Sequence, residues 1–189
     1  MKVYFCAFVG VHLLFSCGSS SSNDDSNLND TRSSALNQVA KPRIPADGSL
    51  DENSRYPIKP NLEMTPGDLC ASASELRYPE KIKYCNRNVD KSTKAMIFDD
   101  YDQKLGFETQ KMERGDFKID HLIPLCMGGS NKEDNLWPQH KSVYAYTDPV
   151  EPYLCDLMSI GKLKQKVAVE IILSIKLDPV HAAEKIRDL

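Results

Sequence analysis

The side chains best suited to chemistry lie close together in residues 117–141, where Asp120 and His121 are adjacent and Asn135 and His140 follow. A carboxylate such as that of Asp120 is a hard oxygen ligand for a divalent cation. A neutral imidazole such as that of His121 can accept a proton from water at physiological pH. Hydrolysis of a phosphodiester needs an activated water, positive charge near the phosphate oxygens and a stabilised leaving oxygen, and one histidine with one divalent cation can meet these needs. The pair therefore predicts metal-assisted hydrolysis.

The chain around this pair predicts a β-ribbon. Apolar residues favour a strand there, namely Phe117, Ile119, Leu122 and Leu125. Successive side chains of a strand point to opposite faces, so Asp120 and His121 can take different tasks. Pro124 cannot donate to a strand ladder and Gly128–Gly129 tolerate positive φ, so we expect the chain to turn there. The NLWPQ run at 135–139 is then the returning arm, with its leucine and tryptophan in the core.

The chain resembles the HNH family of ββα-metal endonucleases in three motifs that occur in order, DHLIPL, GGSN and DNLWPQ, over roughly residues 65–175. This resemblance implies an α+β fold with a ββα-metal core and additional helices. It implies hydrolysis of phosphodiester bonds in nucleic acid, with DNA favoured over RNA as the substrate. It also implies that His121 is the general base, that Asp120 is a metal ligand and that Asn135 orients the loop. The alternative is a catalytically silent HNH-fold lipoprotein that serves as a nucleic-acid or protein binding module.

The last metal ligand departs from the family pattern. In the family it is a histidine or asparagine about nine residues beyond the loop asparagine, a position that is Tyr144 here. The candidates are His140 and Asp148, and we expect His140, because Asp148 precedes Pro149 and is suited to cap the next helix. Asp120 favours Mg²⁺ or Mn²⁺, whereas an added imidazole also accepts Zn²⁺ or Ni²⁺. One divalent metal ion is the expected cofactor, without a small-molecule cofactor.

The N-terminal residues predict export and lipidation. A lysine followed by an apolar run gives residues 1–16 as a signal peptide. The sequence LFSCG at 14–18 resembles the bacterial lipobox, in which the cysteine is lipidated. Cys17 is therefore the expected lipidation site and the anchor to a bacterial membrane, in the periplasm or at the cell surface.

The composition after Cys17 predicts a tether and one domain. Residues 18–61 are rich in Ser, Asn, Asp and Pro and show no sustained hydrophobic period. We therefore expect residues 17–63 to contain the lipidated cysteine and a disordered tether. Residues 64–189 are expected to form the HNH nuclease-like domain, because the remaining length suits one domain.

The remaining cysteines predict two disulfides. Cys6 lies in the signal segment and Cys17 is the expected lipid site, which leaves an even number in an oxidising compartment. These are Cys70, Cys85, Cys126 and Cys155. None of them forms a CxxC pair, so a structural zinc site is the weaker interpretation. Three pairings are possible, and we expect Cys70 with Cys85, which is local, and Cys126 with Cys155, which would tie the ribbon's loop to the facing helix.

The charge of the chain limits how it can bind nucleic acid, its expected partner. A formal net charge of −3 argues against a broad, unspecific polyanion-binding surface. Two local basic clusters can still contact a phosphate backbone, although each alone reads more readily as a solvated face. The first comprises Lys81, Lys83, Arg87, Lys91 and Lys94, and the second Lys162, Lys164 and Lys166.

Helices are expected on both sides of the ribbon in the sequence. Asp90 is suited to cap a helix that ends at Gly106, since apolar residues recur at every fourth position between them. A second helix is expected to begin at Asp148, with Glu151 completing a capping box. Two more are expected, one across 163–177 and a short one after the Asp-Pro pair at 178–179. The acidic residues of the first helix and His181 are expected to be solvated without a chemical role.

Overall fold

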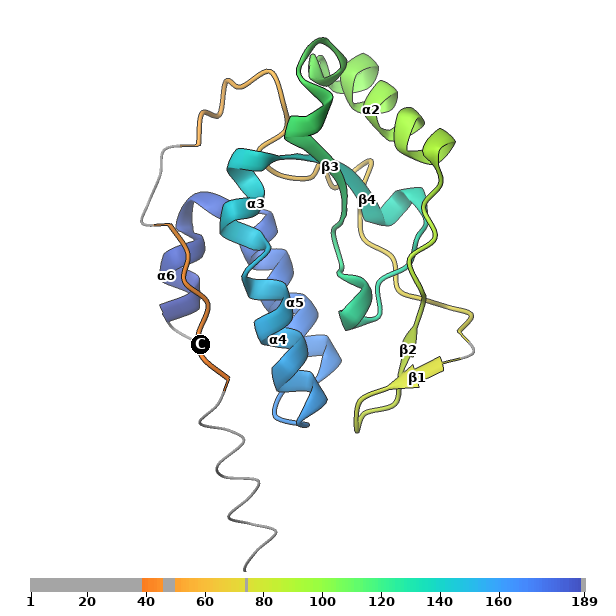
Figure 1. Ribbon diagram of the computed structural model, residues 1–189, viewed down its shortest axis with the longest axis vertical. Helices are drawn as coiled ribbons and strands as arrows, with labels where there is room; N and C mark the ends of the chain where they lie inside the picture. Colours follow the sequence, from red (N-terminus) through yellow and green to blue (C-terminus); the bar gives the residue numbers. More distant parts are fainter. Residues whose placement is uncertain (1–38, 46–49, 74, 188–189) are drawn as a thin grey trace, which may run out of the picture. The chain divides into compact units, whose positions relative to one another are not determined.

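The computed structural model describes residues 39–45, 50–73 and 75–187, and the compact unit that holds the predicted site begins at Val39. Its centre is a two-stranded antiparallel ribbon of β3 (Phe117–His121) and β4 (Leu136–His140). Helix α2 (Lys91–Leu105) packs on one side of the ribbon, and the helices that follow β4 gather on the other (Figure 1). The unit is therefore a mixed α+β structure, as expected.

The ribbon forms where the sequence predicts it. Phe117 pairs with His140 at one end of the ladder and His121 pairs with Leu136 at the other. Beyond the ladder, the chain turns through short 3-10 helices at Leu125–Met127 and Glu133–Asn135. Gly128 follows the first of these with φ of 85°, a left-handed conformation that favours glycine.

Helix α2 has the ends that the sequence predicts. The side chain of Asp90 accepts a hydrogen bond from the backbone N–H of Thr93, which satisfies one of the free donors at the helix start. Gly106 ends the helix with φ of 76°. Ile97, Phe98 and Tyr101 are buried against the ribbon.

The helices after the ribbon begin earlier than expected. Helix α3 (Lys141–Thr147) starts directly at the end of β4, and Asp148 lies at its C-terminus and not at the start of the next helix. The expected capping box is wrong, because α4 (Val150–Ser159) follows Pro149 without a side-chain cap. The remaining helices are α5 (Gln165–Lys176), a 3-10 turn (Pro179–His181) and α6 (Ala182–Arg187), close to the expected positions.

Two apolar cores lie on the two sides of the ribbon. The core towards α2 contains Ile58, Ile97, Phe98, Tyr101, Phe117, Ile119, Leu136, Trp137 and Val143. The core among the C-terminal helices includes Ile123, Met127, Tyr146, Val150, Leu154, Met158, Ile172, Ile175 and Ile186. The ribbon therefore has a packed layer on each face, which fixes the direction of the side chains that it carries.

Both expected disulfides are confirmed. Cys70 joins Cys85, beside the small hairpin of β1 (Glu75–Arg77) and β2 (Ile82–Tyr84). Cys126 joins Cys155, which ties the ribbon's loop to α4. Two disulfides indicate an oxidising environment of the extracellular type. Within the described residues, no helix has the length and apolar character needed to cross a membrane.

Only part of the expected tether lies within the described residues. Residues 1–16, Cys17 and the following chain to residue 38 lie outside the described residues. Residues 50–63 are described, and they do not form the expected tether, because Tyr56 packs against the ribbon and Ile58 is buried in the core. The folded unit therefore begins well before the expected boundary at residue 64, since scattered apolar residues in a polar run are enough to anchor it.

Candidate functional site

Asp120 and His121 lie at the end of β3 and point to opposite faces of the ribbon, as their adjacent positions in a strand require. Both are buried, at 5% and 3% exposure. The carboxylate of Asp120 faces the C-terminal helices. The imidazole of His121 faces the loop that connects β2 to α2. The two predicted reactive groups thus belong to one dipeptide but have separate surroundings.

Both ring nitrogens of His121 have partners. Nη2 of Arg87 lies 3.3 Å from Nδ1, and Oδ1 of Asn131 lies 3.1 Å from Nε2. A guanidinium can only donate, so Nδ1 is the acceptor and Nε2–H donates to Asn131. Asn131 is itself fixed, because its amide nitrogen donates to the carbonyl of Asn86 and its oxygen accepts from the N–H of Asn88. This network sets the tautomer and the orientation of the imidazole.

Burial keeps His121 neutral. The pKa of His121 falls from 6.5 to about 4, chiefly because the buried ring loses hydration of its charged form. The hydrogen bond to Asn131 opposes this shift, and the nearby charge of Arg87 adds to it. At physiological pH the imidazole therefore carries a lone pair and no charge.

Asn135 ties together the loop between the strands. Its amide oxygen accepts from the N–H of Ile123 at 2.8 Å, and its amide nitrogen donates to the carbonyls of Ile123 and Ser130 at 2.9 Å. Gly129 lies against the same bonds, since a Cβ there would be 1.8 Å from the carbonyl oxygen of Ile123. Asn135 thus holds the loop, which is the task that the motif resemblance implies for it.

The structure does not bring His140 to Asp120. His140 pairs with Phe117 in the ladder, three positions from Asp120 and on the other face. Its Nδ1 accepts from the backbone N–H of Ser142, which makes His140 the N-cap of α3, and its ring stacks on Tyr56 at 3.9 Å. The imidazole expected as the last metal ligand therefore has a capping and packing role here.

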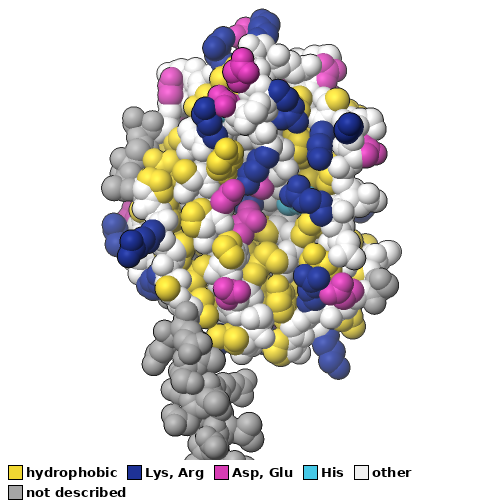
Figure 2. Space-filling view, in the orientation of Figure 1, with side chains coloured by type: hydrophobic (Ala, Val, Ile, Leu, Met, Phe, Trp, Pro, Cys, Tyr) yellow, Lys and Arg dark blue, Asp and Glu magenta, His cyan; other side chains and the backbone are white. Residues whose placement is uncertain are grey.

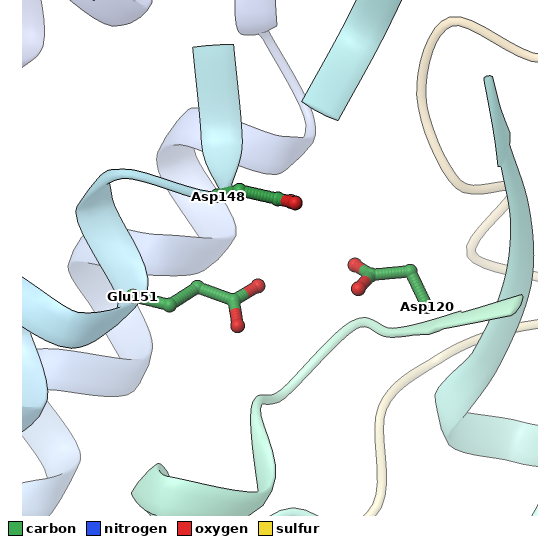
Figure 3. Close-up of side chains that lie close together, drawn as sticks. All are labelled: Asp120, Asp148 and Glu151. Carbon is green, nitrogen blue, oxygen red and sulfur yellow. The ribbon is translucent and has the colours of Figure 1, made fainter. Parts of the chain in front are cut away.

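Asp148 takes the position beside Asp120 instead. One carboxylate oxygen from each of Asp120, Asp148 and Glu151 lies within 4.8 Å of the others. Figure 3 shows the three carboxylates pointing towards one another, Asp120 from the ribbon and the other two from the helical side. The sequence favoured Asp148 as a helix cap and His140 as a ligand, whereas His140 is the cap and the helical chain starts at Lys141, eight residues before the expected first helical position.

Two lysines share this acidic cluster. Nζ of Lys176 donates to Oδ2 of Asp120 at 2.7 Å and to the carbonyl of His121 at 2.6 Å. It also lies 2.6 Å from Oε1 of Glu151, as an ion pair without the direction of a hydrogen bond. Nζ of Lys118 contacts both oxygens of Asp148 and lies 3.3 Å from Oδ1 of Asp120. Sequence reasoning assigned no role to either lysine.

The lysines set the charge of the cluster. Burial opposes the ionised form of Asp120, but the ammonium groups of Lys176 and Lys118 outweigh it and lower the pKa of Asp120. Burial raises the pKa of Glu151, and the charge of Lys176 only partly offsets this effect. The pKa of Lys176 rises despite burial, because Asp120 and Glu151 stabilise its charge. Lys176 is therefore a permanent cation, and of its two carboxylate partners Glu151 takes up a proton more readily than Asp120.

The carboxylates fit a hard divalent cation in their chemistry. Three convergent carboxylates give the all-oxygen set that Mg²⁺ and Mn²⁺ prefer. Zn²⁺ and Ni²⁺ fit less well, since the imidazole of His140 lies on the other face of the ribbon.

Comparisons with known protein families, with curated proteins and with solved structures find no match for this chain. Function must therefore be inferred from the geometry of the His121 network and of the acidic cluster, together with the motifs of the sequence.

Proposed function

We propose that the protein is a metal-dependent endonuclease of the HNH type that hydrolyses phosphodiester bonds of nucleic acid, DNA in preference to RNA, outside the cytoplasm. The observation that carries this proposal is the neutral imidazole of His121 next to Asp120, whose carboxylate meets those of Asp148 and Glu151. The ribbon, the loop held by Asn135 and the helix directly after β4 support a ββα-metal core.

His121 is the general base. Asn131 holds its Nε2–H through an amide oxygen, so Nδ1 is the atom that takes the proton. Arg87 now donates to Nδ1, but it is exposed and its guanidinium suits a phosphate oxygen. When Arg87 turns to the phosphodiester, Nδ1 is free to accept a proton from the attacking water. The oxygen of this water bonds to phosphorus, the bond to the leaving oxygen breaks, and solvent protonates the leaving oxygen.

Asp120, Asp148 and Glu151 are the residues that would hold one Mg²⁺ or Mn²⁺ ion. Such an ion, when bound, would offset charge on the phosphate oxygens and stabilise the leaving oxygen. Lys176 keeps Asp120 ionised and fixes the carbonyl of His121, so the two catalytic side chains keep their relative placement. This replaces the earlier expectation of His140 as the ligand.

The proposed setting is a bacterial membrane, to which a lipid on Cys17 anchors the exported chain after removal of residues 1–16. The disulfides support an oxidising compartment. Nucleic acid is the proposed partner. Figure 2 shows basic, acidic and hydrophobic side chains mixed on one face, which suits local contacts to a backbone better than a continuous polyanion-binding surface.

A catalytically silent binding module is the second candidate, and Lys176 favours it. Its buried ammonium already satisfies Asp120 without a metal ion. A scaffold of this kind would keep the ribbon, the disulfides and the loop while binding nucleic acid or protein without cleavage.

Metal-dependent nicking of plasmid DNA by the soluble mature chain tests the proposal. His121→Ala should lower cleavage at least about a hundredfold, the lower end for a lost general base, and should leave Mn²⁺ affinity unchanged. In calorimetry, Asp148→Ala should weaken Mn²⁺ binding at least about tenfold, whereas His140→Ala should not. His181→Ala is the matched control, because that ring lies on the surface with Asp178. Absence of nicking by the unmodified chain with either metal would refute the endonuclease and favour the silent module.

A further inference from the structure

We propose that Lys118 is an exchangeable internal cation, which occupies the oxygens of Asp120 and Asp148 until a divalent ion displaces it. This inference rests on the proposed metal site and adds how that site is regulated. Lys118 would then release its carboxylates on metal binding, whereas Lys176 would stay in place.

The two lysines differ in how firmly they are held. The side chain of Lys176 is 0% exposed, and its ammonium lies within 2.7 Å of three oxygens on three different residues. The side chain of Lys118 is 35% exposed and bonds mainly to Asp148, itself 41% exposed. Lys118 can therefore swing into water at little cost in hydration, but Lys176 would leave buried charges without a partner.

The charges of the cluster favour exchange over simple addition of an ion. With every group ionised, three carboxylates and two ammonium groups give a charge of −1. Adding a divalent ion to this set would leave a charge of +1. Replacing Lys118 by the ion leaves the carboxylates, Lys176 and the ion at zero, which is the most favourable sum in a partly buried site. The same exchange frees both oxygens of Asp148.

A buried amide on the ribbon face that carries Asp120 lacks one hydrogen-bond partner. Gln139 is 0% exposed and lies opposite Lys118 in the ladder, on the face that carries Asp120. Its amide nitrogen donates to the hydroxyl of Thr147, next to Asp148 in the chain, but its Oε1 has no hydrogen-bond partner among the described residues. A buried acceptor without a partner is costly, so a donor brought to this face on metal binding, such as a water molecule, would stabilise it.

Competition between Lys118 and the ion makes a measurable prediction. Lys118→Met removes the competitor and leaves the three carboxylates, so Mn²⁺ should bind at least about threefold more tightly, as expected for the loss of a partly exposed ion pair. Lys141→Met is the matched control. Its ammonium pairs with Asp116 at 2.8 Å, outside the cluster, and Mn²⁺ affinity should not change.

The experiment is calorimetric titration of MnCl₂ into the mature chain and into the two variants. A second measurement uses the unmodified chain alone. Trace acetylation followed by mass spectrometry should label Lys118 faster when Mn²⁺ is added, while Lys176 stays unlabelled in both conditions.

Equal or weaker Mn²⁺ binding by Lys118→Met, or a rate of Lys118 labelling that does not change with Mn²⁺, would overturn the exchange and leave the proposed endonuclease standing. Mn²⁺ binding to none of the three proteins would overturn the exchange and the metal-dependent function together. Tight binding with exchange but without plasmid nicking would support the exchange and refute only the endonuclease.

Discussion

Acidification should destabilise the protein through His121. The ring is 3% exposed and lies between Arg87 and Asn131, and its pKa falls from 6.5 to about 4 on folding. Between these values the unfolded chain binds a proton that the folded chain does not. Stability is therefore fully present above the unfolded pKa and is lost as the pH falls towards the folded pKa. In the folded chain the proposed base would lose its lone pair only near the lower end of this range, at its own pKa of about 4.

The size of this loss follows from the two pKa values. The full difference corresponds to about 3 kcal/mol, because one pKa unit is worth about 1.4 kcal/mol. Lowering the pH from about 7.5 to about 5 covers part of the range and should remove about 2 kcal/mol of unfolding free energy through this residue. Urea unfolding with the disulfides intact, at several pH values, measures the loss.

The His121→Asn variant isolates the contribution of this ring. It should lose about 2 kcal/mol less than the unmodified chain over the same pH range. Burial also lowers the pKa of His140, but that ring titrates in both proteins and cancels in the comparison. His181→Asn is the control, because the hydrogen bond from Asp178 raises the pKa of His181 and gives a contribution of opposite sign, lost as the pH rises. An equal acid loss in His121→Asn and the unmodified chain would refute the buried, neutral histidine.

Three further predictions concern the loop that carries the site, and urea unfolding measures each. Gly129→Ala should cost more than about 2 kcal/mol, because its Cβ would overlap a backbone carbonyl, whereas Gly115→Ala has open space and should be nearly neutral. Asn135→Ala should cost about 3 kcal/mol, since it leaves buried backbone groups of the loop without partners; a loss below about 1 kcal/mol would show that water replaces the amide. Replacing Cys126 and Cys155 by alanine should cost about 3 kcal/mol through the unfolded chain, and mass spectrometry of the non-reduced protein should find neither thiol free.

Local signals allowed much of the fold to be predicted. Asp90 and Gly106 define α2 because a side-chain cap and a left-handed glycine act within one turn of the chain. The Pro124 and Gly128 positions likewise end β3 and turn the ribbon. Cys126–Cys155 was the preferred one of the possible pairings for Cys126, because the ribbon's loop and the following helix were expected to face each other, and the structure confirms it.

The start of the helical chain after the ribbon was misplaced because two local signals compete. His140 and Asp148 can each cap a helix, and the sequence does not show which of two possible starts the helix uses. Packing decides this, because Tyr56 stacks on His140 from a segment expected to be a tether. The cap at His140 then places Asp148 one helix length further on, beside Asp120.

The sequence by itself determined the placement of the Asp120–His121 dipeptide, proposed here as reactive, and of the turn and loop residues that present it, because strand alternation and turn chemistry depend on near neighbours in the chain. Only the tertiary structure decided the surroundings of that dipeptide. Lys176 reaches Asp120 from 56 residues away, and Arg87 reaches His121 from 34 residues away. Neither contact leaves a periodic or local trace, since both depend on how α5 and the loop before α2 pack against the ribbon. The charge of the acidic cluster and the pKa of the proposed base are therefore properties of the packing.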